Sequence, residues 1–233
     1  MKHTVRVFTA LILSASVHTG MAADIVGTIK LKGTAPAETP IPLDPACGKL
    51  HDKPMTTTHF VVGPGGELAN TVVYLKSVSG KSAGASAVPI VIDQSGCQYS
   101  PHISAAQTGQ KILVKNSDTF LHNVHPTPTA PGNKEENKAQ MPKGADLTFS
   151  YNTPEQFLRF KCDVHPWMFA YVTVVDHPYI AVSGKDGKFK ISNVPAGKYT
   201  ISAAHRKAAP GGVDKEIEVK GDSVTADFTL ELK

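Results

Sequence analysis

The 233-residue sequence has no apolar run long enough to cross a membrane, and no long stretch of it shows helical periodicity. A membrane-spanning helix needs roughly 20 apolar residues, and the apolar run at residues 7–17 is too short for one. Segments that alternate between apolar and polar residues, separated by Gly, Pro, Asn and Asp turns, dominate instead. We therefore predict an all-β fold and no membrane span.

An excess of charge of one sign is also missing. The chain has 24 Lys and Arg residues against 20 Asp and Glu residues. Removal of residues 1–23 would take away Lys2 and Arg6 and no acidic residue, which leaves 22 basic residues against 20 acidic ones, a net charge of +2. This charge is too small to favour nucleic acid or an anionic membrane as a partner.

The N-terminus has the parts of a secretory signal peptide. A basic start is followed by the apolar run at residues 7–17 and by small residues up to Ala23. The alternative is a buried N-terminal helix, but this order of segments is typical of an export signal. We predict that residues 1–23 are a signal peptide and that the mature protein is soluble and periplasmic.

Cysteine is scarce, and the three cysteines make an odd number. Cys47 and Cys97 both lie in turn-rich segments and could pair in an oxidising compartment, which would leave Cys162 as a free thiol. The alternative is a second metal site made by Cys97 and His102, although two donors do not make a site.

The most informative stretch is residues 157–175. Leu158, Phe160 and Cys162 alternate with Arg159 and Lys161, so a strand would turn the thiol toward a core. The following loop adds an imidazole and a thioether at C-x2-H-x2-M spacing. Soft sulfur donors with imidazole suit copper, and a His2Cys set with a weak Met is the blue-copper arrangement. The second histidine is expected from residues 120–125, and zinc is the alternative metal.

Residues 121–125 (LHNVH) and 162–168 (CDVHPWM) resemble the two ligand segments of the small blue copper proteins, the cupredoxins, and the spacing is most similar to amicyanin. The likeness covers residues 86–176. It implies a Greek-key β-sandwich, one copper ion cycling between Cu(I) and Cu(II), and the ligands His122, Cys162, His165 and Met168. Asn123 resembles the family's asparagine that ties the two ligand loops together by hydrogen bonds.

Two features of this loop bear on partners. Amicyanin-like loops usually carry a proline before the second histidine, where this chain has Asp163 and Val164. His165 stands beside Pro166 and Trp167, so we expect an exposed edge of its ring, with these two neighbours in an apolar docking surface for a redox partner.

The flanking segments have another character. Residues 177–233 resemble the carboxypeptidase regulatory-like, transthyretin-type sandwich through their D-G-x-F-x-I and P-x-G-x-Y-x-I runs. That family begins with strands like those in residues 24–80, so we predict that 24–80 and 177–233 form one discontinuous sandwich. Between the strands, residues 34–42 are expected to be a proline-rich surface connection and residues 126–144 a solvated loop.

The sequence contains no paired carboxylates, Ser-His-Asp set or Gly-rich phosphate loop that would indicate catalysis. We therefore predict an electron carrier and not an enzyme. The amicyanin likeness suggests a c-type cytochrome or a periplasmic dehydrogenase as partner. The alternatives are a copper-handling protein that stores or delivers the ion, and a structural or carbohydrate-interacting sandwich with an incidental metal site.

Overall fold

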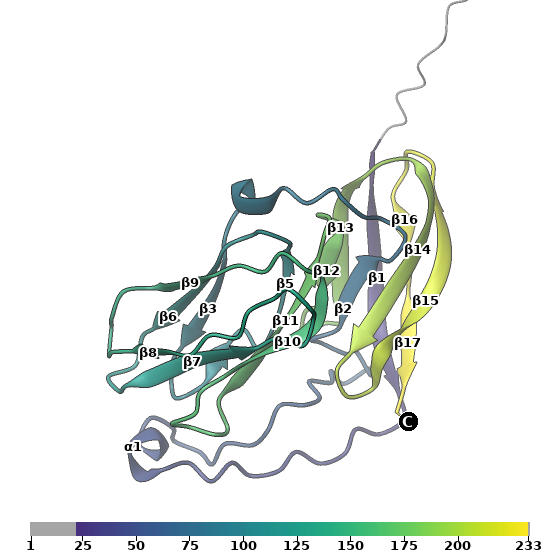
Figure 1. Ribbon diagram of the computed structural model, residues 1–233. Helices are drawn as coiled ribbons and strands as arrows, with labels where there is room; N and C mark the ends of the chain where they lie inside the picture. The colour runs from purple at the N-terminus through teal and green to yellow at the C-terminus, as the bar shows by residue number, and fades with distance from the viewer. Residues whose placement is uncertain (1–21, 233) are drawn as a thin grey trace, which may run out of the picture.

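A computed structural model describes residues 22–232 of the chain, and residues 1–21 of the predicted signal peptide lie outside the described residues. The regular elements among the described residues are strands, apart from α1 (Pro45–Gly48) and the short 3-10 helix η1 (Gly84–Ser86). Two β-sandwiches lie side by side (Figure 1). The all-β prediction is confirmed. In the part of the chain that the structure describes, no helix has the length and apolar character to cross a membrane.

The first sandwich consists of two sheets, with strand orders β5-β11-β10-β7-β8 and β4-β3-β6-β9. The strands of the five-stranded sheet are β5 (Ile103–Gln107), β7 (His122–Thr127), β8 (Lys138–Gln140), β10 (Glu155–Lys161) and β11 (Phe169–Val175). Those of the facing sheet are β3 (Ile90–Gln94), β4 (Tyr99–Ser100), β6 (Ile112–Asn116) and β9 (Leu147–Phe149). One hydrophobic core fills the space between the two sheets.

The alternation in β10 has the predicted effect, because Leu158, Phe160 and Cys162 are all buried in this core. Strand β11 is different, since both of its faces are buried. Its second face packs at the junction of the two sandwiches, where Tyr171 meets Ile103 and Val72.

The second sandwich also consists of two sheets. In one of them β1 lies between β13 and the C-terminal strands β16 and β17, and the other has the order β12-β2-β14-β15. The first sheet contains β1 (Ala23–Lys32), β13 (Lys188–Val194), β16 (Val224–Thr225) and β17 (Phe228–Glu231). The second contains β2 (Val72–Leu75), β12 (Ile180–Val182), β14 (Gly197–His205) and β15 (Ala209–Val219).

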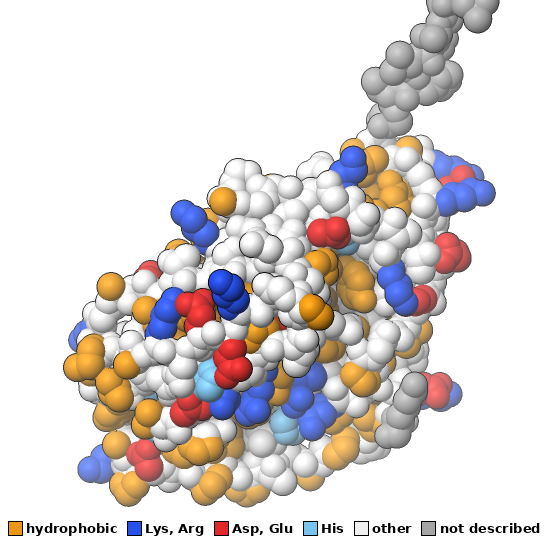
Figure 2. Space-filling view, viewed as in Figure 1, with side chains coloured by type: hydrophobic (Ala, Val, Ile, Leu, Met, Phe, Trp, Pro, Cys, Tyr) orange, Lys and Arg blue, Asp and Glu red, His pale blue; other side chains and the backbone are white. Residues whose placement is uncertain are grey.

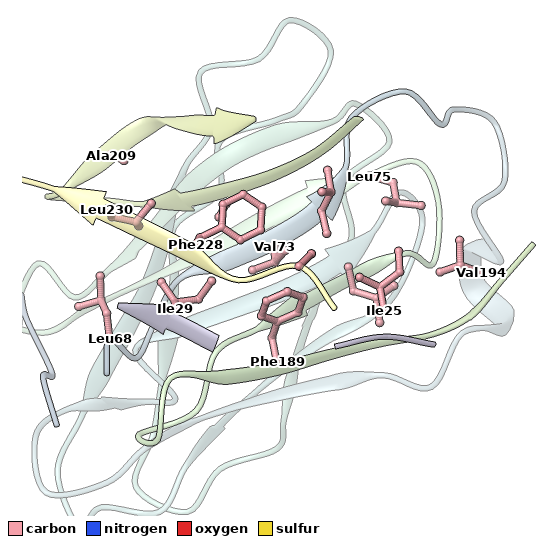
Figure 3. Packing of buried hydrophobic residues seen from close by; sticks show 14 of the residues in the cluster. Ile25, Ile29, Leu68, Val73, Leu75, Phe189, Val194, Ala209, Phe228 and Leu230 are labelled. Atoms are coloured by element: carbon pink, nitrogen blue, oxygen red, sulfur yellow. The ribbon is translucent and has the colours of Figure 1, made fainter. Parts of the chain in front are cut away.

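Strands from the two ends of the chain build this sandwich together. β1 pairs with β13 in antiparallel fashion and with β17 in parallel fashion. Ile29 is fully buried and packs in one core with Phe189 and Phe228 (Figure 3). The turn before β13 needs a glycine, because Gly187 has φ +71° and a Cβ there would stand 2.6 Å from the carbonyl oxygen of Ile29. The domain boundaries, and the likeness to the transthyretin type, stay predictions.

Residues 33–58, called the strap below, leave β1 and run to the far end of the first sandwich, where α1 lies (Figure 1). Leu43 and Cys47 belong to the hydrophobic core of the first sandwich. The strap closes on itself through a bridge between Pro40 and Thr56. Residues 34–42 are exposed or half-buried, as expected for a surface connection, and the side chains that reach the other sandwich come directly after them.

The predicted solvated loop at residues 126–144 contains a strand that the sequence did not indicate. β8 pairs with β7 in the register His122 opposite Gln140. Three residues, Lys-Ala-Gln, are too few and too polar to show an alternating pattern, so the strand exists only because β7 offers an open edge.

Candidate metal centre

The four predicted ligands lie at the same end of the first sandwich. His122 is the first residue of β7, and Cys162 directly follows β10, which pairs with β7. The loop from Cys162 to Met168 is tight, because the backbone N–H of Met168 donates to the carbonyl of His165 at 2.8 Å and that of Cys162 donates to the carbonyl of Met168 at 3.1 Å. All four side chains are buried. Strand pairing thus brings together residues 40 positions apart.

Both imidazoles turn Nδ1 toward the thiol. Sγ of Cys162 lies 4.0 Å from Nδ1 of His122 and 3.7 Å from Nδ1 of His165, and the two nitrogens are 3.0 Å apart. A soft ion binds nitrogen at about 2.0 Å and sulfur at about 2.3 Å, so two donors of one ion stand up to roughly 4 Å apart. The three donor atoms fit one ion.

Asp118 holds the ring of His122 from behind. Nε2 of His122 donates to Oδ2 of Asp118 at 2.9 Å, which places the proton on Nε2 and leaves the lone pair of Nδ1 facing Cys162. A hydrogen bond from the outer ring nitrogen fixes the tautomer and orientation of a ligating histidine.

The carboxylate of Asp118 is itself held in place. The backbone N–H groups of Gly96 and Cys97 donate to its two oxygens at 2.6 Å and 2.8 Å. Both residues have positive φ, 64° and 52°, and successive N–H groups in such a turn converge on an anion. Asp118 is buried, and its carboxylate oxygens accept hydrogen bonds from three N–H groups, which compensate the burial of the charge.

These contacts shift the pKa of each of the three donors. Burial raises the pKa of the Cys162 thiol, but the contact with His122 and the neighbouring backbone N–H groups outweighs it and leaves this pKa lowered. Burial also works to lower the pKa of His122, yet Cys162 and Asp118 leave it raised. The pKa of His165 is lowered by burial and by the neighbouring His122. A metal ion binds the thiolate and the neutral imidazoles, so its binding would release any proton held between Cys162 and His122.

Asn123 joins the two ligand segments. Its Oδ1 accepts hydrogen bonds from the backbone N–H of Asp163 at 2.7 Å and of Val164 at 3.3 Å. The thiol of Cys162 also donates to this oxygen, at 3.3 Å. One amide side chain on β7 therefore fixes the start of the loop that carries the other three predicted ligands.

The expected exposed edge of His165 is wrong, because the ring is only 7% exposed. The strap covers it, and Oδ2 of Asp44 stands 3.4 Å from Nε2 of His165. Asp44 also caps α1 by accepting from the N–H groups of Ala46 and Cys47. Its pKa is lowered chiefly by the Cys47 N–H, so it faces the imidazole as a carboxylate.

The two predicted docking residues differ from each other. Pro166 is exposed, whereas Trp167 is half-buried and its Nε1 donates to the carbonyl of Cys97 at 3.2 Å. Trp167 therefore helps to pack the loop against the facing sheet.

The predicted disulfide is confirmed, since Cys47 and Cys97 are bridged. The bridge pins the strap beside the centre, and its sulfurs lie within 4.8 Å of a ring nitrogen of His165. The alternative metal site at Cys97 and His102 is therefore wrong in this oxidation state. His125 does not join the donor cluster, because its Nδ1 and Nε2 each lie 2.6 Å from a carboxylate, those of Asp163 and Glu135.

Sequence reasoning missed Asp118 and Asp44. Asp118 had a usable signal, because it stands four residues before His122 in a turn. Asp44 had none, because it lies far from every ligand in the sequence and reaches His165 only through the path of the strap.

No protein-family model matches the chain, and no curated protein matches it. Solved structures resemble part of it. Cu(I) amicyanin with a methionine-to-alanine substitution is 18% identical, with 44% of this chain and 97% of that one covered and a TM-score of 0.33. Reduced amicyanin with a tryptophan-to-tyrosine substitution is 22% identical over the same shares, with a TM-score of 0.34. A copper-containing nitrite reductase from Thermus scotoductus SA-01 is 17% identical, with 37% of this chain and 22% of that one covered and a TM-score of 0.33.

Proposed function

We propose that this protein is a periplasmic carrier of single electrons, and not an enzyme, with one type-1 copper ion held by His122, Cys162, His165 and Met168. The observation that supports this proposal is the convergence of two Nδ1 atoms on the thiol of the buried Cys162. Bound copper would supply a one-electron couple between Cu(I) and Cu(II). The chain itself would keep the donors in place and exclude water.

The rigidity of the donors is what an electron carrier needs, because both oxidation states must be held in nearly one geometry. Asp118 and Asn123 restrain one ligand segment each, and both are buried. The Cys47–Cys97 bridge and Asp44 restrain the strap that covers His165. A preorganised, dry donor set avoids rearrangement when the charge of the ion changes.

Partner docking is proposed at the end of the molecule that carries the centre. Leu121 directly precedes His122 and is 42% exposed, and Val164 directly precedes His165 and is 50% exposed. Figure 2 shows hydrophobic side chains at this end, over β8 and around α1, with a few charged side chains beside them. A small apolar contact suits the brief encounters of redox proteins, with a c-type cytochrome or a periplasmic dehydrogenase as the proposed partner.

Copper reconstitution of the mature chain tests the proposal. We expect intense visible absorption from thiolate-to-Cu(II) charge transfer, together with a type-1 EPR spectrum and reversible redox cycling. Cys162→Ser removes the thiolate and should abolish the colour without unfolding the sandwich. A coloured Cys162→Ser protein would refute the assignment.

The histidine assignment has a matched control. His122→Gln removes a buried donor and should weaken copper binding strongly. His125→Gln, three residues along the same strand, removes a ring that faces Asp163 and Glu135 and should leave the visible spectrum in place. Equal spectra for the two variants would contradict the proposed ligand set.

Met168→Leu tests the thioether. The substitution conserves volume in a core position that is 1% exposed, so the fold should persist. We expect the colour to remain and the redox potential to rise, because a weak donor to Cu(II) is lost. Met141→Leu, at an exposed position, should leave the potential unchanged. Transfer of Cu(I) from the unchanged, copper-loaded protein to an acceptor chelator distinguishes electron carriage from copper handling. A copper-handling protein would give up Cu(I) readily, whereas an electron carrier would retain it.

A further inference from the structure

A cavity of about 280 Å³ lies between the strap and the first sandwich. Pro40, Pro42 and Thr58 line it from the strap, and Trp167 and Phe169 line it from the other side. Met168 also forms part of its wall, so the cavity borders the metal-binding loop without being part of the donor set.

Two imidazoles give the cavity its polar character. The ring of His102 lies 5.2 Å from that of Phe169, and the ring of His59 stacks on the same phenyl group at 6.4 Å with an angle of 18° between the planes. Both histidines line the cavity. Nδ1 of His59 is buried and has no hydrogen-bond partner among the described residues, which is costly unless a guest supplies one.

The tautomer of His102 is set by its backbone contact. Its Nδ1 stands 3.1 Å from the carbonyl oxygen of Phe169, and a carbonyl can only accept, so Nδ1 carries the proton. Burial lowers the pKa of His102 to about 4, so the ring is neutral near pH 7. Any hydrogen bond that it makes to a guest therefore uses the lone pair of Nε2, and the guest must donate.

The volume limits the size of the guest. An engineered apolar cavity of about 150 Å³ in another protein holds one benzene molecule, and sites for drug-sized ligands begin near 300 Å³. The present cavity therefore has room for one substituted ring. Flat walls of Trp167 and Phe169 favour an aromatic guest over an aliphatic one.

We propose that this cavity is a binding site for a small uncharged aromatic molecule with a ring hydroxyl, of the phenol or hydroquinone class, whose hydroxyl donates to His102 while its ring packs against Trp167 and Phe169. The site is independent of the proposed electron carriage, because none of its polar contacts involves a predicted metal ligand.

Phenol and toluene are the matched probes, because they have nearly the same size and only phenol can donate. We expect saturable binding of phenol to the mature, disulfide-bonded chain by NMR titration of the His102 and His59 ring signals. Phenol should bind roughly five- to tenfold more tightly than toluene, the value of one net hydrogen bond. Binding should occur in both the copper-free and the copper-loaded protein, so failure of the copper proposal would leave this result unaffected.

Four variants locate the site. His102→Phe should reduce the affinity for phenol to that for toluene, whereas His102→Gln keeps an acceptor and should stay within threefold of the unchanged protein. Thr58→Trp fills the cavity from an exposed position and should abolish binding of both probes, and Thr229→Trp, exposed on β17, should have no effect.

Two results would overturn the proposal. One is the absence of saturable binding of phenol to the folded chain. The other is equal affinity for phenol and toluene together with an unaltered affinity in His102→Phe. If His102→Phe does not fold, Thr58→Trp still decides whether the cavity is the site.

Discussion

Asp118→Asn is the sharpest test of how the centre is preorganised. The carboxylate accepts three hydrogen bonds, from the Nε2 of His122 and from the backbone N–H groups of Gly96 and Cys97. An amide has one acceptor oxygen, so at least one of these buried N–H groups faces an NH₂ group instead. Water has little access to replace the lost contact, since Asp118 is only 7% exposed.

The loss of stability in Asp118→Asn can be worked out from these three hydrogen bonds. A buried donor without an acceptor costs about 1–3 kcal/mol, and hydrogen bonds that lose a charged partner weaken by about 1 kcal/mol each. The free energy of unfolding of the copper-free protein should therefore fall by about 3–5 kcal/mol. Because the ring of His122 loses its restraint, the affinity for copper should also fall by about 10- to 100-fold.

Urea unfolding of the copper-free protein and competition with a copper chelator measure the two effects. Asp222→Asn, an exposed turn position, is the control and should change neither. If Asp118→Asn unfolds within about 1 kcal/mol of the unchanged protein and binds copper equally well, the turn at Gly96 and Cys97 does not position His122, and this reasoning fails.

Three further predictions concern the strap, the second sandwich and acid stability. Replacing Cys47 and Cys97 by Ala removes a bridge across 50 residues. The free energy of unfolding should fall by about 4 kcal/mol through the lost loop-closure entropy, and hydrogen exchange in the strap should increase. Unchanged exchange would show that the bridge does not hold the strap in place over His165. Ile29→Ala, in the core with Phe189, should lower the free energy of unfolding by about 2–5 kcal/mol and leave copper affinity unchanged, and a loss of affinity would show that β1 supports the centre. Burial lowers the pKa of both His102 and His205 to about 4. Below pH ~6.5 these two rings therefore bind protons in the unfolded chain but stay neutral in the folded chain. The free energy of unfolding should fall between pH ~6.5 and ~4 by on the order of 3 kcal/mol for each ring. Urea midpoints across this range would measure the slope, which should flatten in His102→Phe.

The local pattern of the sequence was enough to predict the strands that carry the ligands. In β10, burial alternates with the pleat, and Cys162 follows at the next inward position, so the direction of the thiol could be read from Leu158 and Phe160. The disulfide between Cys47 and Cys97 followed from the assignment of Cys162 as a free thiolate ligand, which left the other two cysteines to pair.

Burial on the second face of β11 could not be read in this way. A period of two in the sequence shows which side of a strand is more apolar. Tyr171, however, is buried by Ile103 on the neighbouring strand β5 and by Val72 on β2 of the second sandwich. The edge strand β8 was missed for a similar reason, because its pairing depends on the position of β7 and not on its own three residues.

The sequence by itself determined the all-β class, the donor types and the inward direction of Cys162, because these depend on side-chain chemistry and on a period of two along one strand. Only the tertiary structure decided that Asp118 and Asp44 stand behind the two imidazoles and that the strap buries His165. Contacts between segments far apart in the chain depend on the path of the whole backbone, and no local pattern of residues records that path.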